Sequence, residues 1–250
     1  MQFQRRCDPS GVQLVGGDCR AADAGGVTAR DVIVLADSTP LARGFEREVH
    51  AHPTEPDRLL KVLVPAEHQG GGGPARRFFA ARGPKFRDFL IAREYREYAR
   101  AALSLPRIGA RLPITHMFGF QDTDLGLACV TERVSDEAGA LAPTLDALSR
   151  GGALSDDQIA ALTDFARRLL RYDIRCSDLT RKNIALGYRA GPTRRGPFEA
   201  VLVDGFGDTH AIAVRTVSRR VNAASVHRKL GRIAEKSGLV WDTTGEVFTR

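Results

Sequence analysis

The sequence predicts an α+β fold with strands in its N-terminal half and helices in its C-terminal half. Three observations lead to this prediction. Short apolar runs such as DVIVLA (31–36) and LLKVLV (59–64) are typical of strands. Apolar residues recur at helical spacing after residue 85 and again after Ser155. Two further short runs, 184–189 and 198–204, predict a small hairpin inserted among the C-terminal helices. The 250 residues suffice for one large domain or for two lobes.

The N-terminal half begins with a Gly- and Asp-rich extension, residues 1–30, which has little apolar pattern. After the strand 31–36, residues 38–64 predict a strand, a turn at HPTEP and a returning strand from Leu59 to Val64. Residues 65–77 contain a run of glycines and predict a flexible loop.

A helix is predicted from Phe86 to Leu103. Phe86, Leu90, Glu94 and Tyr98 follow one another at a spacing of four, so a carboxylate lies on an apolar helix face. A carboxylate is rarely buried without a partner, so Glu94 predicts a buried ion pair. Glu97 is the competing candidate.

The remaining elements follow in order. Residues 114–120 and 127–134 predict a hairpin, and residues 142–155 a connection marked by Pro and Gly. Ser155 and Gln158 form a capping box at the start of a helix. The chain from Ala211 onward is predicted to be helical and basic.

Composition restricts the class of protein. The net charge of +7 favours anionic partners such as nucleotides, nucleic acid or a membrane surface. The four cysteines are far apart and form no CxxC pair, and Cys129 and Cys176 lie in apolar segments, as expected for buried thiols in a reducing compartment. No apolar run is long enough to span a bilayer and no secretory leader is predicted, so we expect a cytoplasmic protein.

Four polar residues at or near the ends of elements suggest phosphate chemistry. Asp178 precedes Asn183 by five residues, Asp204 ends an apolar strand, and Lys61 lies within the strand 59–64. Phosphoryl transfer requires cations on the phosphates, oxygen ligands for Mg²⁺ and a group that orients the attacking hydroxyl. Lys61 could supply the cation, Asn183 and Asp204 the metal ligands, and Asp178 the base.

With Glu94 added, this set resembles the protein-kinase signatures: a strand lysine, a helix glutamate, an Asp-x4-Asn catalytic loop and a metal loop, here DGFG (204–207). More narrowly, LARGFEREVHAHPTEPDRLLKVL, REYREYARA, LPITHMFGF, CSDLTRKNIAL and VLVDGFGD resemble the YrbL family, kinase-like bacterial proteins named for a PhoP regulatory network. The likeness covers roughly residues 40–235 in order.

The resemblance implies a two-lobed, protein-kinase-like fold with a small antiparallel-sheet N-lobe and a short, mostly helical C-lobe. We expect an extension with one strand at 1–38, the N-lobe at 39–133 and the C-lobe at 134–250. ATP and Mg²⁺ would bind between the lobes. The implied roles are then as follows: Lys61 contacts phosphates and pairs with Glu94, Asp178 is the base, Asn183 and Asp204 hold the metal, and Gly44, Glu132 and Val134 contact the nucleotide.

The sequence departs from the kinase pattern in several places. Its phosphate loop has a single glycine, Gly44, and Arg43 or Arg47 could compensate. Cys176 and Ser177 replace the usual His-Arg. Because DGFG has one residue more than the usual DFG, Asp208 is a second candidate metal ligand. The short C-lobe argues against a peptide-substrate groove and leaves a small-molecule acceptor or autophosphorylation open.

Other interpretations remain. Asp178 and Asn183 could be turn and cap residues, Lys61 a solvated lysine on an edge strand, and Glu94 a surface acid. A catalytically inactive pseudokinase that acts by partner binding is the main alternative function. Nucleic-acid binding through the basic tail is a second, which the lack of interleaved aromatic residues disfavours. The phosphate acceptor is not identified by the sequence.

Overall fold

In the computed structural model the chain divides into two compact units, Met1–Asp31 and Val32–Arg250. The structure describes residues 32–44, 47–63, 83–105, 110–189, 196–207 and 218–250, with side chains omitted for 83–90. All of these belong to the second unit, and the predicted N-terminal extension up to residue 31 lies outside them.

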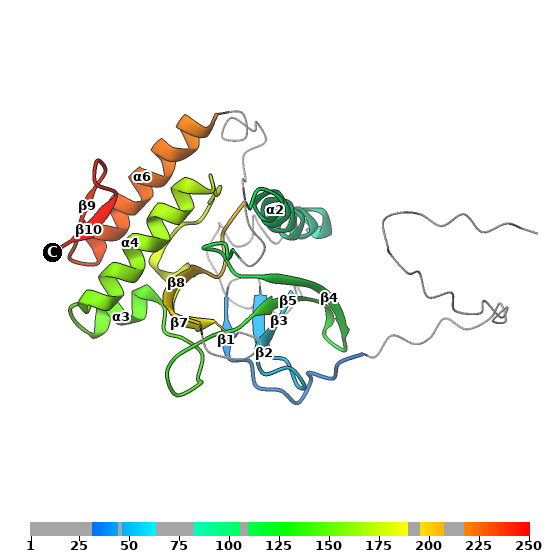
Figure 1. The fold of residues 1–250 in the computed structure, drawn as a ribbon. Coiled ribbons are helices and arrows are strands. Elements are labelled where there is room, and N and C mark those ends of the chain that lie inside the picture. Colours follow the sequence, from blue (N-terminus) through cyan, green and yellow to red (C-terminus); the bar gives the residue numbers. More distant parts are fainter. Residues whose placement is uncertain (1–31, 45–46, 64–82, 106–109, 190–195, 208–217) are drawn as a thin grey trace, which may run out of the picture. The chain divides into compact units, whose positions relative to one another are not determined.

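The N-lobe is built on a five-stranded antiparallel sheet. Its strands stand in the order β1-β2-β3-β5-β4, so β3 is central (Figure 1). The strands are β1 (Ala42–Arg43), β2 (Arg47–Ala51), β3 (Arg58–Leu63), β4 (Met117–Thr123) and β5 (Gly126–Glu132). The predicted hairpin between 114 and 134 is present as β4 and β5, whereas the strand predicted at 31–36 makes only an isolated bridge from Ile33 to Thr123.

The two faces of this sheet differ in chemistry because side chains alternate along a strand. Leu60 and Val62 of β3 pack with Leu35, Ala128 and Val130 into a small core on one face. On the other face Lys61 lies opposite Val49 of β2 and Cys129 of β5. The central strand is therefore buried on both sides, which explains its nearly continuous apolar sequence.

The long helix α2 (Gly83–Leu103) packs beside β4. It contains the predicted span 86–103 and begins three residues earlier. Tyr95 stacks on Phe120 with ring centroids 4.5 Å apart, and the Tyr95 hydroxyl donates to the carbonyl of Gly119. The side chains of Phe86 and Leu90, which supported the prediction, lie outside the described part.

The C-lobe combines helices with two small sheets. Its helices are α3 (Leu145–Gly151), α4 (Asp156–Arg171) and α6 (Arg219–Lys236), and η2 (Arg181–Asn183) is a single 3₁₀ turn. One sheet has the order β6-β7-β8 and the other β9-β10. The strands are β6 (Val134–Ser135), β7 (Ile184–Arg189), β8 (Phe198–Leu202), β9 (Val240–Asp242) and β10 (Val247–Thr249).

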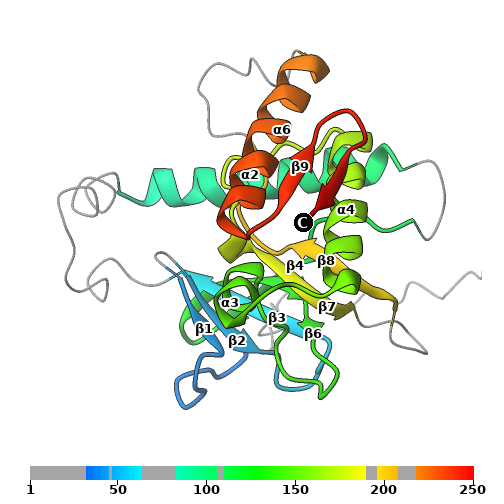
Figure 2. The same cartoon turned by 90° about the vertical axis from the view of Figure 1, so that its left-hand side faces the viewer.

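Helix α4 is the centre of the C-lobe core. The capping box predicted at Ser155 and Gln158 is present, and Phe165, Ala166 and Leu169 are fully buried. Helices α4 and α6 lie beside one another with the β9–β10 hairpin against them (Figure 2). Helix α6 buries Val226, Leu230 and Ile233 in the same core, so one face of this basic helix is structural.

Two details of the C-lobe prediction were wrong. The connection at 142–155 contains helix α3, which begins after the N-cap Thr144, a residue whose preference for that position outweighs the breaking effect of the flanking Pro and Gly. The tail after residue 239 forms a hairpin because Trp241 and Phe248 pack against each other and the core, with ring centroids 4.7 Å apart and ring planes tilted by 50°. The predicted fold class, α+β with two lobes and an antiparallel N-lobe sheet, is confirmed.

Candidate functional site

A cleft of about 710 Å³ lies between the inner face of the N-lobe sheet, helix α2 and the loops of the C-lobe. The sequence analysis nominated eight residues, far apart in the chain, and each of them lines this cleft. They are Gly44, Lys61, Glu94, Glu132, Val134, Asp178, Asn183 and Asp204.

Backbone hydrogen bonds hold the loop 175–183 against the loop 203–207. Gly207 N–H donates to the carbonyl of Arg175, Asp178 N–H to that of Gly205, and Val203 N–H to that of Asn183, at 2.7 to 3.0 Å. These bonds place Asp178, Asn183 and Asp204 together although they come from different segments.

The two glycines of the DGFG loop are required by close packing. Gly205 has φ of +78°, and a Cβ there would lie 2.6 Å from the carbonyl oxygen of Asp178. Gly207 has φ of +91°, and its Cβ would lie 2.9 Å from the carbonyl oxygen of Arg93 on α2. Both the positive φ and the lack of space exclude other residues. Gly205 and Gly207 thus allow the DGFG loop to pack closely between Asp178 and α2. Asp208, the alternative candidate metal ligand, lies outside the described residues.

Lys61 is buried in the centre of the sheet and points toward the segment that leads into the DGFG loop. Its Nζ donates to the carbonyl of Val203 at 2.5 Å. The alternative that Lys61 is a solvated lysine on an edge strand is therefore wrong. Burial alone would raise the pKa of Asp204, but the nearby charges of Lys61 and Arg47 lower it well below its usual range. Asp204 is consequently ionised in the folded protein.

Glu94 is buried, as its position on the helix predicts, but its partner is Arg47. The Arg47 Nη1 donates to Glu94 Oε2 at 2.8 Å. The predicted Lys61–Glu94 pair is absent from the described ion pairs, and so is a Lys61–Glu97 pair, since Glu97 binds Arg100 and Arg175. The register of β2 and β3 explains why Arg47 and not Lys61 binds Glu94. Arg47 and Lys61 project from the same face of the sheet. The longer arginine reaches the carboxylate, and Lys61 donates its hydrogen bond to the carbonyl of Val203.

The second oxygen of Glu94 is under-satisfied. Among the described residues Glu94 Oε1 accepts no hydrogen bond. Burial, followed by the charge of the neighbouring Asp204, raises the pKa of Glu94 to about 7. The two carboxyl groups are close enough for a protonated Glu94 to donate a hydrogen bond to Asp204. The adjacent Glu94 and Asp204 thus differ sharply: the pKa of Asp204 is well below its usual range, whereas that of Glu94 is raised to about 7.

Asp178 and Asn183 are joined through the amide of Asn183. Its Nδ2 donates to both the carbonyl oxygen and Oδ2 of Asp178, each at 2.9 Å. These bonds turn the amide oxygen of Asn183 away from Asp178. The Asp178 residue is exposed at the cleft, where an incoming hydroxyl could reach it.

The remaining three predicted residues line the part of the cleft nearest the sheet and the β5–β6 connection. Gly44 N–H donates to the carbonyl of Arg47 at 2.8 Å, and this bond links the end of β1 to the start of β2. The Glu132 carboxylate accepts from His116 N–H at 3.2 Å and lies 3.4 Å from Arg189. The carbonyl of Val134 accepts from Ala142 N–H at 2.9 Å. The side chain of Glu132 thus has a structural role besides its place in the cleft.

Two residues support the loop 175–183 through contacts that the sequence did not predict: Glu97, considered only as an alternative partner of Lys61, and Lys229. Glu97 accepts the backbone N–H of Arg175 at 2.8 Å, and Lys229 of α6 donates to the carbonyl of Ser177 at 3.0 Å and to that of Cys176. The Glu97 contact could have been anticipated, because a second carboxylate on the buried part of a helix also needs a partner. Lys229 is one of several basic residues on α6, and nothing in the sequence distinguishes it.

The donor set fits Mg²⁺ bound with a polyphosphate. Mg²⁺ prefers hard oxygen ligands and commonly uses one or two carboxylates besides phosphate and water. Asp204, whose pKa is well below its usual range, could supply a carboxylate, and Asn183, in the same cleft, could supply an amide oxygen. The described part of the chain holds no group of three or more His, Cys, Asp or Glu side chains suited to a metal, so a site built from protein ligands alone is not found there. That part also contains no helix long and apolar enough to cross a membrane.

Comparison with known proteins gives a family match. The family described as "PhoP regulatory network protein YrbL" matches residues 33–238. "Uncharacterized protein YrbL" of Escherichia coli (strain K12) is 28% identical over 141 residues, which are 56% of this chain and 57% of the relative. The protein of the same name from Shigella flexneri gives the same figures. The alignment thus spans little more than half the length of these curated relatives.

Two solved structures of WbdD are among the structures similar to this chain. A co-crystal structure of WbdD with the kinase inhibitor LY294002 has a TM-score of 0.40 and 14% sequence identity, covering 70% of this chain and 34% of WbdD. A 2.2 Å crystal structure of WbdD has a TM-score of 0.39 and 13% identity, covering 69% and 33%.

Proposed function

The chain belongs to the PhoP regulatory network protein YrbL family, and from this premise we propose that it binds ATP with Mg²⁺ in the cleft between its lobes and transfers phosphate to a small molecule or to itself. One observation carries the proposal: the residues that the sequence nominated for phosphate, metal and base roles line one cleft of about 710 Å³. That volume is within the usual range for small-ligand sites.

The charges in the cleft support the binding of a nucleotide polyphosphate. Arg43, Arg47, Arg93, Lys61 and Lys182 all line it. In this proposal Lys61 and Arg47 face the phosphates, and Arg47 takes over part of the role that a glycine-rich loop plays in other kinases. Asn183 and Asp204 hold Mg²⁺, which when bound neutralises charge on the phosphate oxygens.

Asp178 is the proposed base. It is exposed at the cleft, and the Asn183 amide fixes its orientation through two hydrogen bonds. In this role it accepts the proton of the attacking hydroxyl as the oxygen–phosphorus bond forms. Lys182 lies on the same loop and borders the cleft, where it can balance charge on the transferred phosphoryl group.

Nucleotide binding is tested by thermal unfolding. ATP with Mg²⁺ at millimolar concentration should raise the midpoint temperature, since a ligand that binds the folded state stabilises it. The shift should disappear in Lys61→Met and Asp204→Asn. Lys236→Met, at the end of α6 and outside the cleft lining, is the charge-matched control and should keep the shift. No shift in the unaltered protein with either Mg²⁺ or Mn²⁺ would refute the proposal.

Phosphate transfer is tested separately with radiolabelled ATP. The Asp178→Asn variant should keep the thermal shift but lose labelled product by a factor of about 10² or more, because loss of a general base typically has that effect. Equal product formation by the variant and the unaltered protein would rule out the assigned base while leaving nucleotide binding intact.

A catalytically inactive nucleotide-binding module is the second candidate. It is favoured by the pairing of Glu94 with Arg47 while Lys61 binds a backbone carbonyl. It predicts a Mg²⁺-dependent thermal shift with no labelled phosphate on any product, including the protein itself. Regulation through a partner would then be the function of the same cleft.

A further inference from the structure

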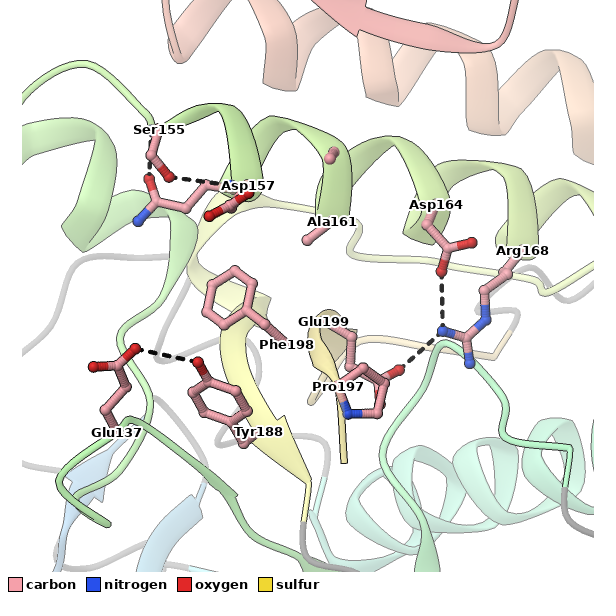
Figure 3. A pocket seen from close by; sticks show the side chains of 12 residues that line it. Glu137, Ser155, Asp157, Ala161, Asp164, Arg168, Tyr188, Pro197, Phe198 and Glu199 are labelled. Carbon is pink, nitrogen blue, oxygen red and sulfur yellow. Dashed lines mark hydrogen bonds and ion pairs between the residues drawn. The ribbon is translucent and has the colours of Figure 1, made fainter. Parts of the chain in front are cut away.

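A second hollow lies on the C-lobe between helix α4 and the β7–β8 hairpin, and its volume is about 570 Å³ (Figure 3). No residue that lines it also lines the inter-lobe cleft. The hollow has a helical wall from α4, an aromatic wall from the hairpin and one residue, Glu137, from the segment after β6. The α4 part comprises Asp157, Gln158, Ala160, Ala161, Asp164 and Arg168.

Small residues on α4 create the space. Ala160 and Ala161 lie between Asp157 and Asp164 on the helix, so no long side chain fills the gap toward β8. The opposite wall is the edge-to-face pair Tyr188 and Phe198, with ring centroids 5.5 Å apart and ring planes at 66°. Figure 3 shows the Phe198 ring next to α4 and the Tyr188 ring farther from the helix, with its hydroxyl toward Glu137. The result is a groove with an aromatic wall that runs along a helix.

The groove is acidic in a basic chain. Its lining includes four carboxylates, Glu137, Asp157, Asp164 and Glu199, and one guanidinium, Arg168, whereas the whole chain carries a net charge of +7. Arg168 binds Glu199 at 2.9 Å and Asp164 at 3.2 Å, so its charge is already engaged. The same contacts pair Asp164 and Glu199 with Arg168, and the four negative and one positive groups together leave an excess of negative charge that suits the groove to cations.

We propose that this groove docks an arginine-rich segment of a partner protein in an extended conformation. Asp157 and Asp164 are seven residues apart on one helix face, about 10 Å, which is the span of about three residues of extended chain. An arginine between them can lie over Tyr188 or Phe198, where the ring face attracts a cation. The open, elongated form along α4 fits a peptide chain better than a compact cation.

The first measurement is the binding of a fluorescein-labelled octapeptide of alternating arginine and alanine, followed by fluorescence anisotropy without nucleotide. The protein should bind this peptide more tightly than a twin with glutamate in place of arginine, and the affinity should fall with added salt. Because the chain as a whole repels a basic peptide, measurable binding requires a local acidic site.

Two variants locate the site. Asp157→Lys should weaken binding by about fivefold, as expected for one exposed ion pair at the groove. Ala160→Trp, at an exposed position of α4, should fill the groove and weaken binding by about tenfold or more. The matched control is Asp156→Lys, which makes the same charge change one residue earlier, where the side chain pairs with Arg250 outside the groove. It should alter the affinity by less than about twofold.

Three results would overturn the proposal: no binding of the basic peptide, equal weakening by Asp156→Lys and Asp157→Lys, or binding of spermine as tight as that of the peptide. Far-ultraviolet circular dichroism of each variant, with thermal unfolding, identifies any loss of folding. Since Asp156, Asp157 and Ala160 are all exposed on α4, each variant should fold.

Discussion

Glu94 and Glu97 occupy successive turns of helix α2, and both are almost completely buried, at 2% and 4% exposure. Their surroundings are nevertheless opposite. Glu97 receives hydrogen bonds from the side chains of Arg100 and Arg175 and from the backbone of Arg175. Glu94 has one guanidinium donor, and its other oxygen faces a second carboxyl group.

This difference distinguishes Glu97, a carboxylate that holds segments of the fold together, from Glu94, a carboxylate that lines the inter-lobe cleft. A buried charge is stable only when its lone pairs are satisfied, and Glu97 meets that condition while joining α2 to the loop 175–183. Glu94 keeps an oxygen without a hydrogen bond in the described structure, beside the ionised Asp204. Buried polar groups that lack a hydrogen-bond partner are expected mainly at functional sites, where a bound ligand can provide the missing partner.

The largest expected effect is at Glu97. Glu97→Ala leaves Arg175 buried without its carboxylate, so the free energy of unfolding should fall by about 3–5 kcal/mol, measured by urea denaturation. Arg96→Ala, an exposed site one residue earlier on the same helix, should change it by less than about 0.5 kcal/mol. A loss below about 1 kcal/mol at Glu97 would remove the distinction between the two carboxylates.

The second effect is the pH dependence contributed by Glu94. Its pKa rises from an ordinary 4.5 to about 7 on folding, so the folded state binds more protons between these values. Stability from this group is therefore complete below about pH 4.5 and is lost as the pH rises through 7. This loss of stability should be on the order of 2 kcal/mol. It is smaller than the full pKa shift implies, because the protein rearranges partly around the ionised Glu94.

Glu94→Gln isolates this contribution, because its amide oxygen can still accept from Arg47 but cannot titrate. In EDTA, the free energy of unfolding of the unaltered protein should fall relative to that of Glu94→Gln between about pH 5 and pH 7.5. The lowered pKa of Asp204 keeps that group outside this window. Parallel curves for the two proteins would show that Glu94 is already ionised at pH 5.

The smallest effect concerns Lys229, which supports the same loop from the opposite side. Lys229→Met removes donors to the carbonyls of Cys176 and Ser177 and should lower the free energy of unfolding by about 1–2 kcal/mol. Lys236→Met on the same helix is the matched control. If both variants are equally stable, the contacts of Lys229 with the carbonyls of Cys176 and Ser177 contribute nothing to stability.

Sequence patterns identified the parts of the site because each part depends on local chemistry. A lysine within an apolar strand, a carboxylate on an apolar helix face, and Asp and Asn at element ends are visible without a structure. Cys129 and Cys176 were likewise predicted to be buried free thiols, and they are. The helix at α4 followed from its capping box.

The pairing of charges was not predictable in the same way. Which cation reaches Glu94 depends on strand register and on side-chain length, and Arg47 reaches it because β2 lies beside β3 with Arg47 on the inner face. Helix α3 and the β9–β10 hairpin also escaped prediction, since a single N-cap and two core aromatics decided them against the local pattern.

The sequence by itself determined the α+β class and most of the elements, because periodicity and capping are local properties. It also named eight residues of the cleft, of which Gly44, Glu132 and Val134 came only from the family resemblance. The tertiary structure alone decided that Arg47 binds Glu94, that Glu97 and Lys229 contact the loop 175–183, and that Ala160 and Ala161 leave an acidic groove on α4. These features depend on distances between segments far apart in the chain, which no local pattern specifies.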